Sequence, residues 1–123
     1  MAYTTGLVTN TRATGTAATT IVVNTRNAAA GAATVTLKIF AVSPTTLTLT
    51  PIYVSSFAVA GYAADIRTFT IAGNIAYEVQ LDNSAVLANP VYSTYGLDEF
   101  GNLVTEQGFP QAKMTMIPAL VPT

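Results

Sequence analysis

Hydrophobic and polar residues alternate along several short stretches of this chain, and the alternation has the period of a β-strand. In the range Thr34–Val42 the apolar positions that share one face are Val35, Leu37, Ile39 and Ala41. In the range Ile75–Asp82 they are Ile75, Tyr77, Val79 and Leu81. Each range therefore predicts a strand with one face directed to a core.

Further runs rich in Thr, Val, Ile, Tyr and Phe predict the other strands, because these residues favour extended backbone. These runs are Thr19–Thr25, Thr46–Thr50, Ile52–Val54, Phe57–Ala60, Asp65–Ile71, Val91–Leu97, Leu103–Gln107 and Gln111–Ile117. No window keeps the apolar spacing of a helix. Ile52–Val54 and Phe57–Ala60 continue one strand across a break at Ser55-Ser56, so the runs amount to eight or nine short strands. This number indicates an all-β sandwich or a closed barrel, and a jelly-roll-like sandwich of two four-stranded sheets fits it best.

Turn residues separate these runs. Gly73-Asn74 lies between two alternating runs and predicts a two-residue hairpin. The segment Asp98–Asn102 predicts a second hairpin, with Gly101 available for a positive φ. Pro51 predicts a strand edge or a bend, since proline cannot donate to a strand ladder.

The N-terminal residues depart from the strand pattern. Residues 1–16 are rich in Thr, Gly and Asn and contain one short apolar pair, so they predict a connector arm ahead of a β-sandwich domain at 17–123. If the arm docks on a neighbouring copy, its apolar side chains are the expected buried anchors: Tyr3, Leu7 and Val8. A frayed terminus is the alternative explanation.

Charge is scarce in this chain of 123 residues. Only 9 % of the residues are charged, the net charge is −1 and the mean hydropathy is +0.45, whereas about 25 % of residues are charged in ordinary soluble domains. Since charge keeps like surfaces apart, a free monomer of this composition is poorly protected against self-association. We therefore expect much of the surface to be covered by copies of the same chain; a slightly adhesive soluble protein is the alternative.

The sequence offers little catalytic chemistry. It contains no His, Cys or Trp, so the commonest general base and metal ligand are absent. Glu78 and Asp82 share one strand face, where two carboxylates could act as a catalytic pair. A solvent-exposed strand face would carry the same residues. Asp98, Glu99 and Asn102 carry oxygen ligands for calcium, but turn geometry explains the same residues. We expect no enzymatic activity, no cofactor and no metal.

A covalent cross-link is a further possibility. The amine of Lys38 or Lys113 condensing with an Asn side chain would form an intramolecular amide bond, with Glu78 as the acid that promotes it. Such a bond lowers the mass of the chain by one ammonia. Surface lysines without this role are the simpler explanation.

Other partners are not indicated. The five basic residues are scattered and give no footprint for nucleic acid: Arg12, Arg26, Lys38, Arg67 and Lys113. No apolar stretch is long enough to span a membrane, and residues 1–10 have neither the basic nor the apolar region of a signal peptide. Nothing points to a small-molecule substrate.

The stretch Phe57–Asn83, together with Thr34–Val42 upstream, resembles the central section of small spore-associated proteins of Bacillus-like bacteria. This family includes the subunits of endospore appendages, which are pilus-like fibres. The resemblance implies a jelly-roll sandwich made without a signal peptide, with an N-terminal connector that inserts into the preceding subunit. Appendage subunits lock their connectors with cysteines, which this chain lacks, so neighbouring copies would be held by strand pairing and apolar contacts.

These observations favour a structural subunit of a self-assembling filament on a spore or cell surface, joined head to tail by non-covalent strand complementation. Two alternatives remain open. One is a viral capsid, tail or decoration protein with a jelly-roll fold. The other is a small carbohydrate-binding module, against which the low charge and the absence of Trp argue.

Overall fold

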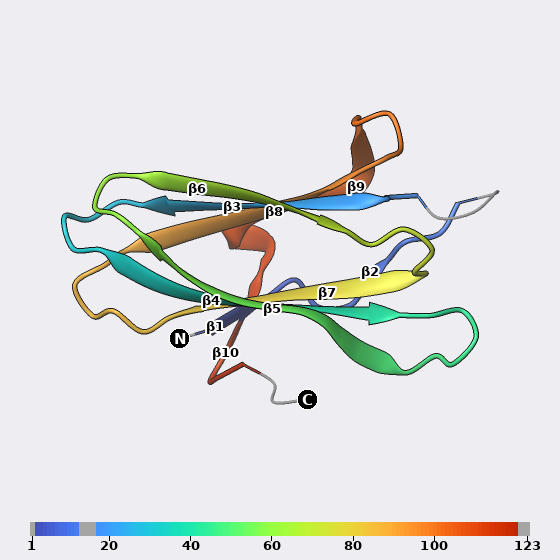
Figure 1. Cartoon of the computed structure of the whole chain (residues 1–123), viewed down its shortest axis with the longest axis horizontal. Helices are drawn as coiled ribbons and strands as arrows, with labels where there is room; N and C mark the ends of the chain where they lie inside the picture. The colour runs from blue at the N-terminus through green and yellow to red at the C-terminus, as the bar shows by residue number, and fades with distance from the viewer. Residues whose placement is uncertain (1, 13–16, 121–123) are drawn as a thin grey trace.

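The computed structural model describes residues 2–12 and 17–120, and in them two antiparallel sheets face each other as a β-sandwich (Figure 1). The larger sheet contains, in spatial order, β10 (Thr115–Ile117), β1 (Ala2–Thr4), β7 (Ala76–Asn83), β4 (Ala33–Val42) and β5 (Leu49–Val59), while β2 (Val8–Thr9) also pairs with β7. The smaller sheet contains β6 (Ala64–Thr70), β3 (Thr20–Asn27), β8 (Pro90–Leu97) and β9 (Leu103–Pro110). The predicted all-β sandwich is confirmed, but the sheets have six and four strands rather than four each.

The core lies between the two sheets and contains the apolar strand faces that the alternation of hydrophobic and polar residues predicts. Val35, Leu37 and Ile39 of β4 are fully buried, as are Tyr77, Val79 and Leu81 of β7. Ile21 and Val23 of β3 and Tyr92 of β8 meet them from the other sheet. Burying one such aliphatic side chain stabilises the fold by about 1.5–3 kcal/mol, so these strands are held mainly by their inner faces.

β5 is one long strand and not the three separate runs that the sequence predicts. It continues through Pro51, and the register of its pairing with β4 shifts between Ile39 and Phe40, which leaves Ile52 without a partner residue. Proline is tolerated here because β5 is an edge strand. Phe40 falls next to this bulge and is fully buried, although its neighbours in sequence predict an outward position.

The two predicted hairpins have opposite outcomes. The segment Asp98–Asn102 joins β8 to β9 in one sheet, the Asp98 N–H donates to the Asn102 carbonyl at 2.9 Å, and Gly101 has φ +81°, as predicted. The Gly73-Asn74 hairpin is wrong, because this turn carries the chain from the smaller sheet to the larger one. β6 pairs with β3 and β7 pairs with β4, so the two strands lie in different sheets.

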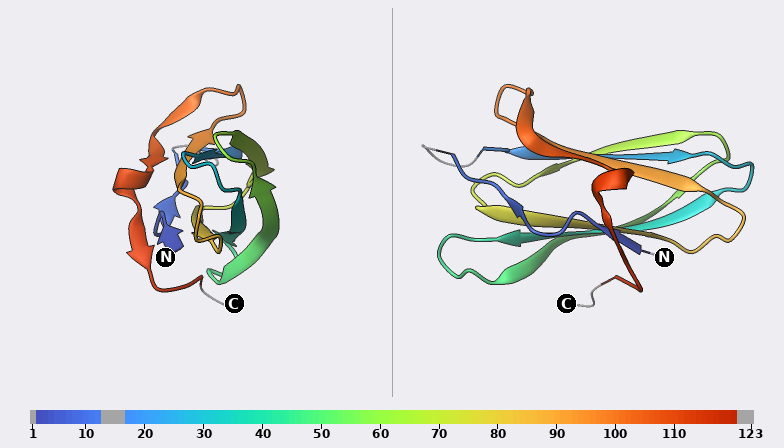
Figure 2. Two further views of the ribbon diagram at one scale, coloured as in Figure 1. Left: turned by 90° about the vertical axis from the view of Figure 1, so that its left-hand side faces the viewer. Right: turned by 180° about the vertical axis from the view of Figure 1, so that it is seen from behind.

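The last predicted strand, Gln111–Ile117, is only partly correct. Its first residues form a short 3-10 turn, η1 (Gln111–Lys113), and only Thr115–Ile117 form a strand. The turn takes the chain from β9 across to the larger sheet, where β10 pairs with β1 (Figure 2). No helix in the described part of the chain is long and apolar enough to cross a membrane.

Candidate functional site

The N-terminal segment, predicted to be an arm at 1–16, is described for residues 2–12. Its strands β1 and β2 pair with β7 and β10 of the same chain and so form part of the larger sheet. β1 lies between β7 and β10 and pairs antiparallel with both: Ala2 faces Asp82 and Ile117, and Thr4 faces Gln80 and Thr115. Residues 13–16 of the predicted arm and Met1 lie outside the described residues. β1 is thus the only strand that connects β10 to the rest of the described sheet.

The three predicted anchor residues occupy different environments. Tyr3 is half-buried and its ring meets that of Tyr92 edge to face, with centroids 5.9 Å apart and an interplanar angle of 64°. Val8 is buried and pairs with Tyr77. The side chain of Leu7 is 62 % exposed. Two of the three residues therefore hold the segment against the sandwich, while Leu7 remains free for another contact.

Polar groups of β7 tie β1 to the sheet. The carboxylate of Glu78 accepts hydrogen bonds from the Thr4 hydroxyl and from Gln80 Nε2, the latter at 3.0 Å. The Thr5 hydroxyl accepts the Val79 N–H at 3.1 Å. The Asp82 carboxylate accepts the neighbouring Asn83 N–H at 2.9 Å. Glu78 and Asp82, considered above as a carboxylate pair, thus make contacts that position backbone and side chains of this sheet.

A buried polar network fixes the chain just after β2. Asn10 is fully buried, and its Nδ2 donates to the carbonyls of Ala18 and Asn74 at 3.0 and 2.9 Å. Its Oδ1 accepts the Ala18 N–H at 2.6 Å and Gln107 Nε2 at 3.0 Å. The Tyr77 hydroxyl donates to Gln107 Oε1 at 2.9 Å. This role could not be predicted from the sequence, because Asn10 stands in a run of Thr and Asn that is also typical of a turn.

Two tyrosines in this region have perturbed ionisation. Burial raises the pKa of Tyr77 and of Tyr92, because the phenolate would lose its hydration. For Tyr92 the nearby Asp82 carboxylate adds to the effect. Within the described residues, the Tyr92 hydroxyl has no hydrogen-bond partner, and the same holds for the hydroxyls of Thr25 and Thr94.

The sheet edges differ in how they are protected against further pairing. β6 carries Asp65 and Arg67, which form an ion pair at 2.8 Å, and β9 carries Glu106 at φ +69° and ends at Pro110. Charges, bulges and proline all discourage strand addition. β5 has none of these after its bulge, so its range 53–59 is a regular, uncharged open edge.

The candidate calcium turn is explained by its own hydrogen bonds. The Asp98 carboxylate accepts the N–H groups of Phe100 and Asn102, both at 2.9 Å. The Glu99 carboxylate is paired with both terminal nitrogens of Arg12, at 3.0 and 2.7 Å, and this contact lowers the pKa of Glu99. In the part of the chain that the structure describes, no cluster of three or more His, Cys, Asp or Glu residues is placed to hold a metal ion.

The two lysines considered for a cross-link lie in different surroundings. Lys38 is on β4, and its cross-strand partners are Gln80 and Val54. Lys113 ends the short turn η1. Neither register partner of Lys38 is an asparagine, so the strand pairing does not supply the second reactant. An intact mass measurement remains the direct test.

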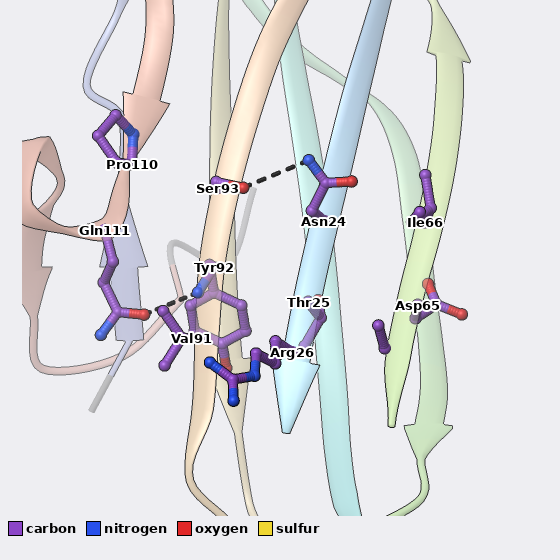
Figure 3. A pocket seen from close by; sticks show the side chains of 11 residues that line it. Asn24, Thr25, Arg26, Asp65, Ile66, Val91, Tyr92, Ser93, Pro110 and Gln111 are labelled. Carbon is purple, nitrogen blue, oxygen red and sulfur yellow. Dashed lines mark hydrogen bonds between the residues drawn. The ribbon is translucent and has the colours of Figure 1, made fainter. Parts of the chain in front are cut away.

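A hollow of about 280 Å³ opens on the outer face of the smaller sheet (Figure 3). Asn24 Nδ2 donates to Ser93 Oγ at 3.3 Å, and Gln111 Oε1 accepts the Tyr92 N–H at 2.8 Å, in place of a ladder bond. Tyr92 is the one aromatic residue of its lining, and that ring is buried in the core. The hollow therefore offers no exposed ring on which a sugar could stack.

Comparison of this chain with protein-family models, with curated proteins and with solved structures finds no match.

Proposed function

We propose that this chain is a structural subunit that self-assembles into a filament at a spore or cell surface, with neighbouring copies joined non-covalently by strand complementation. The observation that carries the proposal is the place of β1, a three-residue strand inserted between β7 and β10. A strand from a neighbouring copy can make the same ladder bonds and the same Tyr3–Tyr92 contact, so exchange costs few contacts.

Two other features support assembly. The uncharged edge of β5 at 53–59 is open to pairing with an added strand. The charged fraction of 9 % leaves little electrostatic repulsion between copies. Because strand exchange from one copy to the next is a head-to-tail contact, it grows into a filament unless the geometry closes a ring.

Strand exchange requires an open sheet edge and not a particular strand order, so it does not depend on a jelly-roll arrangement. A closed shell, as in a viral capsid, would use the same chemistry with a different symmetry. Negative-stain images of the purified protein distinguish the two, because filaments and closed shells differ in outline.

A disulfide test separates pairing within one chain from pairing between copies. Thr4 and Gln80 are directly opposite each other in the β1–β7 register, at a spacing that a disulfide can bridge. The chain has no natural cysteine, so the double variant Thr4→Cys with Gln80→Cys reports this contact alone. If β1 is exchanged, oxidation links successive copies, and a denaturing gel without reductant shows a ladder of covalent multimers.

The matched control is Thr36→Cys with Ser56→Cys, which are opposite each other in the β4–β5 hairpin and belong to one chain. This variant should give only internally linked monomers. Monomers alone from the Thr4–Gln80 variant, under conditions in which the wild type forms multimers, would refute exchange of β1.

A further inference from the structure

The outer face of the larger sheet gathers polar side chains at its centre, where β1, β7 and β4 run side by side (Figure 1). Only 9 % of the residues in this chain are charged. Lys38 of β4 and both Glu78 and Asp82 of β7 nevertheless lie on this one face, because they alternate with the core residues of their strands. Gln80 lies between the two carboxylates and is 1 % exposed, although it faces away from the core.

The strand register places an amine beside a carboxamide. Lys38 and Gln80 are directly opposite each other in the antiparallel pairing of β4 with β7. The Cβ atoms of such a pair are about 4.5–5.5 Å apart, which is less than the combined reach of a lysine and a glutamine side chain. The cross-link that the sequence suggested uses an asparagine, which this register does not supply. Gln80 carries the same carboxamide group on a side chain that is longer by one methylene.

Glu78 is bound to the nitrogen of this carboxamide. Its carboxylate accepts a hydrogen bond from Gln80 Nε2 at 3.0 Å, and the Thr4 hydroxyl donates to the same oxygen and holds it in place. Glu78 is also the diagonal neighbour of Lys38 in the register, which is within reach of a long side chain. A carboxylate in this position can carry protons from the amine to the carboxamide nitrogen.

We propose that Lys38 and Gln80 condense to an intramolecular amide bond that joins β4 to β7, with Glu78 transferring the protons. The Nζ–Cδ bond forms and the Cδ–Nε2 bond breaks. Of the three protons on the Lys38 ammonium group, one stays on the new amide. The other two pass by way of Glu78 to the departing nitrogen, which leaves as ammonium. The reaction needs no oxidant and no cofactor, and Glu78 is a carboxylate again at its end.

The fold favours this slow reaction in two ways. Holding both reactants in place raises their effective concentration, which reaches about 10⁵–10⁸ M in well-oriented intramolecular reactions. The burial of Gln80 keeps water, the competing nucleophile, away from Cδ. A Lys–Gln pair on an exposed strand face has neither this protection nor a carboxylate on the leaving nitrogen. The bond does not depend on the assembly proposed above, because both reactants belong to one chain.

The mass of the intact chain under denaturing conditions tests the bond. We expect the wild type to be lighter than its calculated mass by one ammonia, and a proteolytic digest should contain a branched peptide that joins Lys38 to Gln80. Lys38→Arg should lose this deficit, whereas the matched control Lys113→Arg should keep it. Glu78→Gln should form the bond at least about 100-fold more slowly, since it cannot transfer the protons.

Several results would overturn the bond or its assignment. A wild-type mass equal to the calculated one refutes the bond, whether or not the variants fold. A deficit that persists in Lys38→Arg refutes it too, because an asparagine that cyclises onto its own backbone also loses ammonia. A deficit of one water would mean that Lys38 has condensed with a carboxylate, and a branched peptide without Gln80 would mean another carboxamide; both overturn the assignment to Gln80. An undiminished rate in Glu78→Gln would overturn the role of Glu78.

Discussion

Tyr77 and Tyr92 are both buried in the core, and they differ in what their hydroxyl groups contact. The Tyr77 hydroxyl donates to Gln107, which is itself bonded to Asn10. The Tyr92 hydroxyl has no partner among the described residues. A buried hydroxyl that makes a hydrogen bond contributes to stability. A buried hydroxyl without a partner has lost its hydrogen bonds to water and makes no new one, so it destabilises the fold.

This difference predicts opposite effects of the same substitution. Tyr77→Phe leaves Gln107 Oε1 without its donor and should lower the free energy of unfolding by about 1–3 kcal/mol. Tyr92→Phe removes a hydroxyl that has no partner and should leave the free energy of unfolding unchanged or raise it. Urea denaturation of the two variants measures both values, and equal losses would contradict this account of the core.

At the scale of elements, the N-terminal segment divides into two parts with different attachments. β1 is held by ladder bonds to β7 on one side and to β10 on the other, and a strand of the same sequence from another copy could make the same bonds. Asn10, a few residues later, is enclosed by groups from three distant parts of the same chain: Ala18, Asn74 and Gln107. If β1 is exchanged between copies as proposed, the exchanged part of the predicted arm therefore ends before Asn10.

Truncation and substitution should separate these two parts. Removing residues 1–5 deletes β1 but keeps Asn10, and we expect a folded monomer that no longer assembles. Asn10→Ala in the full chain should still assemble, but it leaves buried partners of Asn10 unpaired at a cost of about 1–3 kcal/mol each. Size-exclusion chromatography and urea denaturation measure the two properties. Filaments formed by the truncated chain would show that β1 is not the donor strand.

For the whole molecule, the two buried tyrosines predict a loss of stability at alkaline pH. Their pKa values are raised in the folded state above the ordinary value near 10. Above pH 10 the unfolded chain has released these protons while the folded chain still holds them, so the unfolded state binds fewer protons and the free energy of unfolding falls as pH rises. Below pH 10 the two tyrosines contribute their full stabilisation.

We therefore expect the wild type to unfold at a lower urea concentration at about pH 11 than at about pH 8. The double variant Tyr77→Phe with Tyr92→Phe should lose much of this difference, because it lacks both groups. A double variant with an unchanged alkaline response would assign the effect to other groups.

Much of the architecture follows from local pattern alone. The faces of β4 and β7 were predictable because alternation fixes which side chains point the same way, and the Asp98–Asn102 hairpin was predictable because its turn satisfies its own hydrogen bonds. The candidate site was only partly predictable. Tyr3 and Val8 signal burial by being apolar, whereas Asn10 and Gln107 are buried only because distant backbone groups surround them.

The sequence by itself determined that the chain is all-β, where most strands run and that almost no charge opposes contact between copies, since these properties depend on residue type and period. The tertiary structure decided which strands pair. In the folded chain Gly73-Asn74 connects the two sheets instead of forming a hairpin, and Phe40 is buried beside the β5 bulge. β1 lies inside the larger sheet, between β7 and β10. Pairing depends on the competition among all strands for apolar partners, and no local window of the sequence contains that competition.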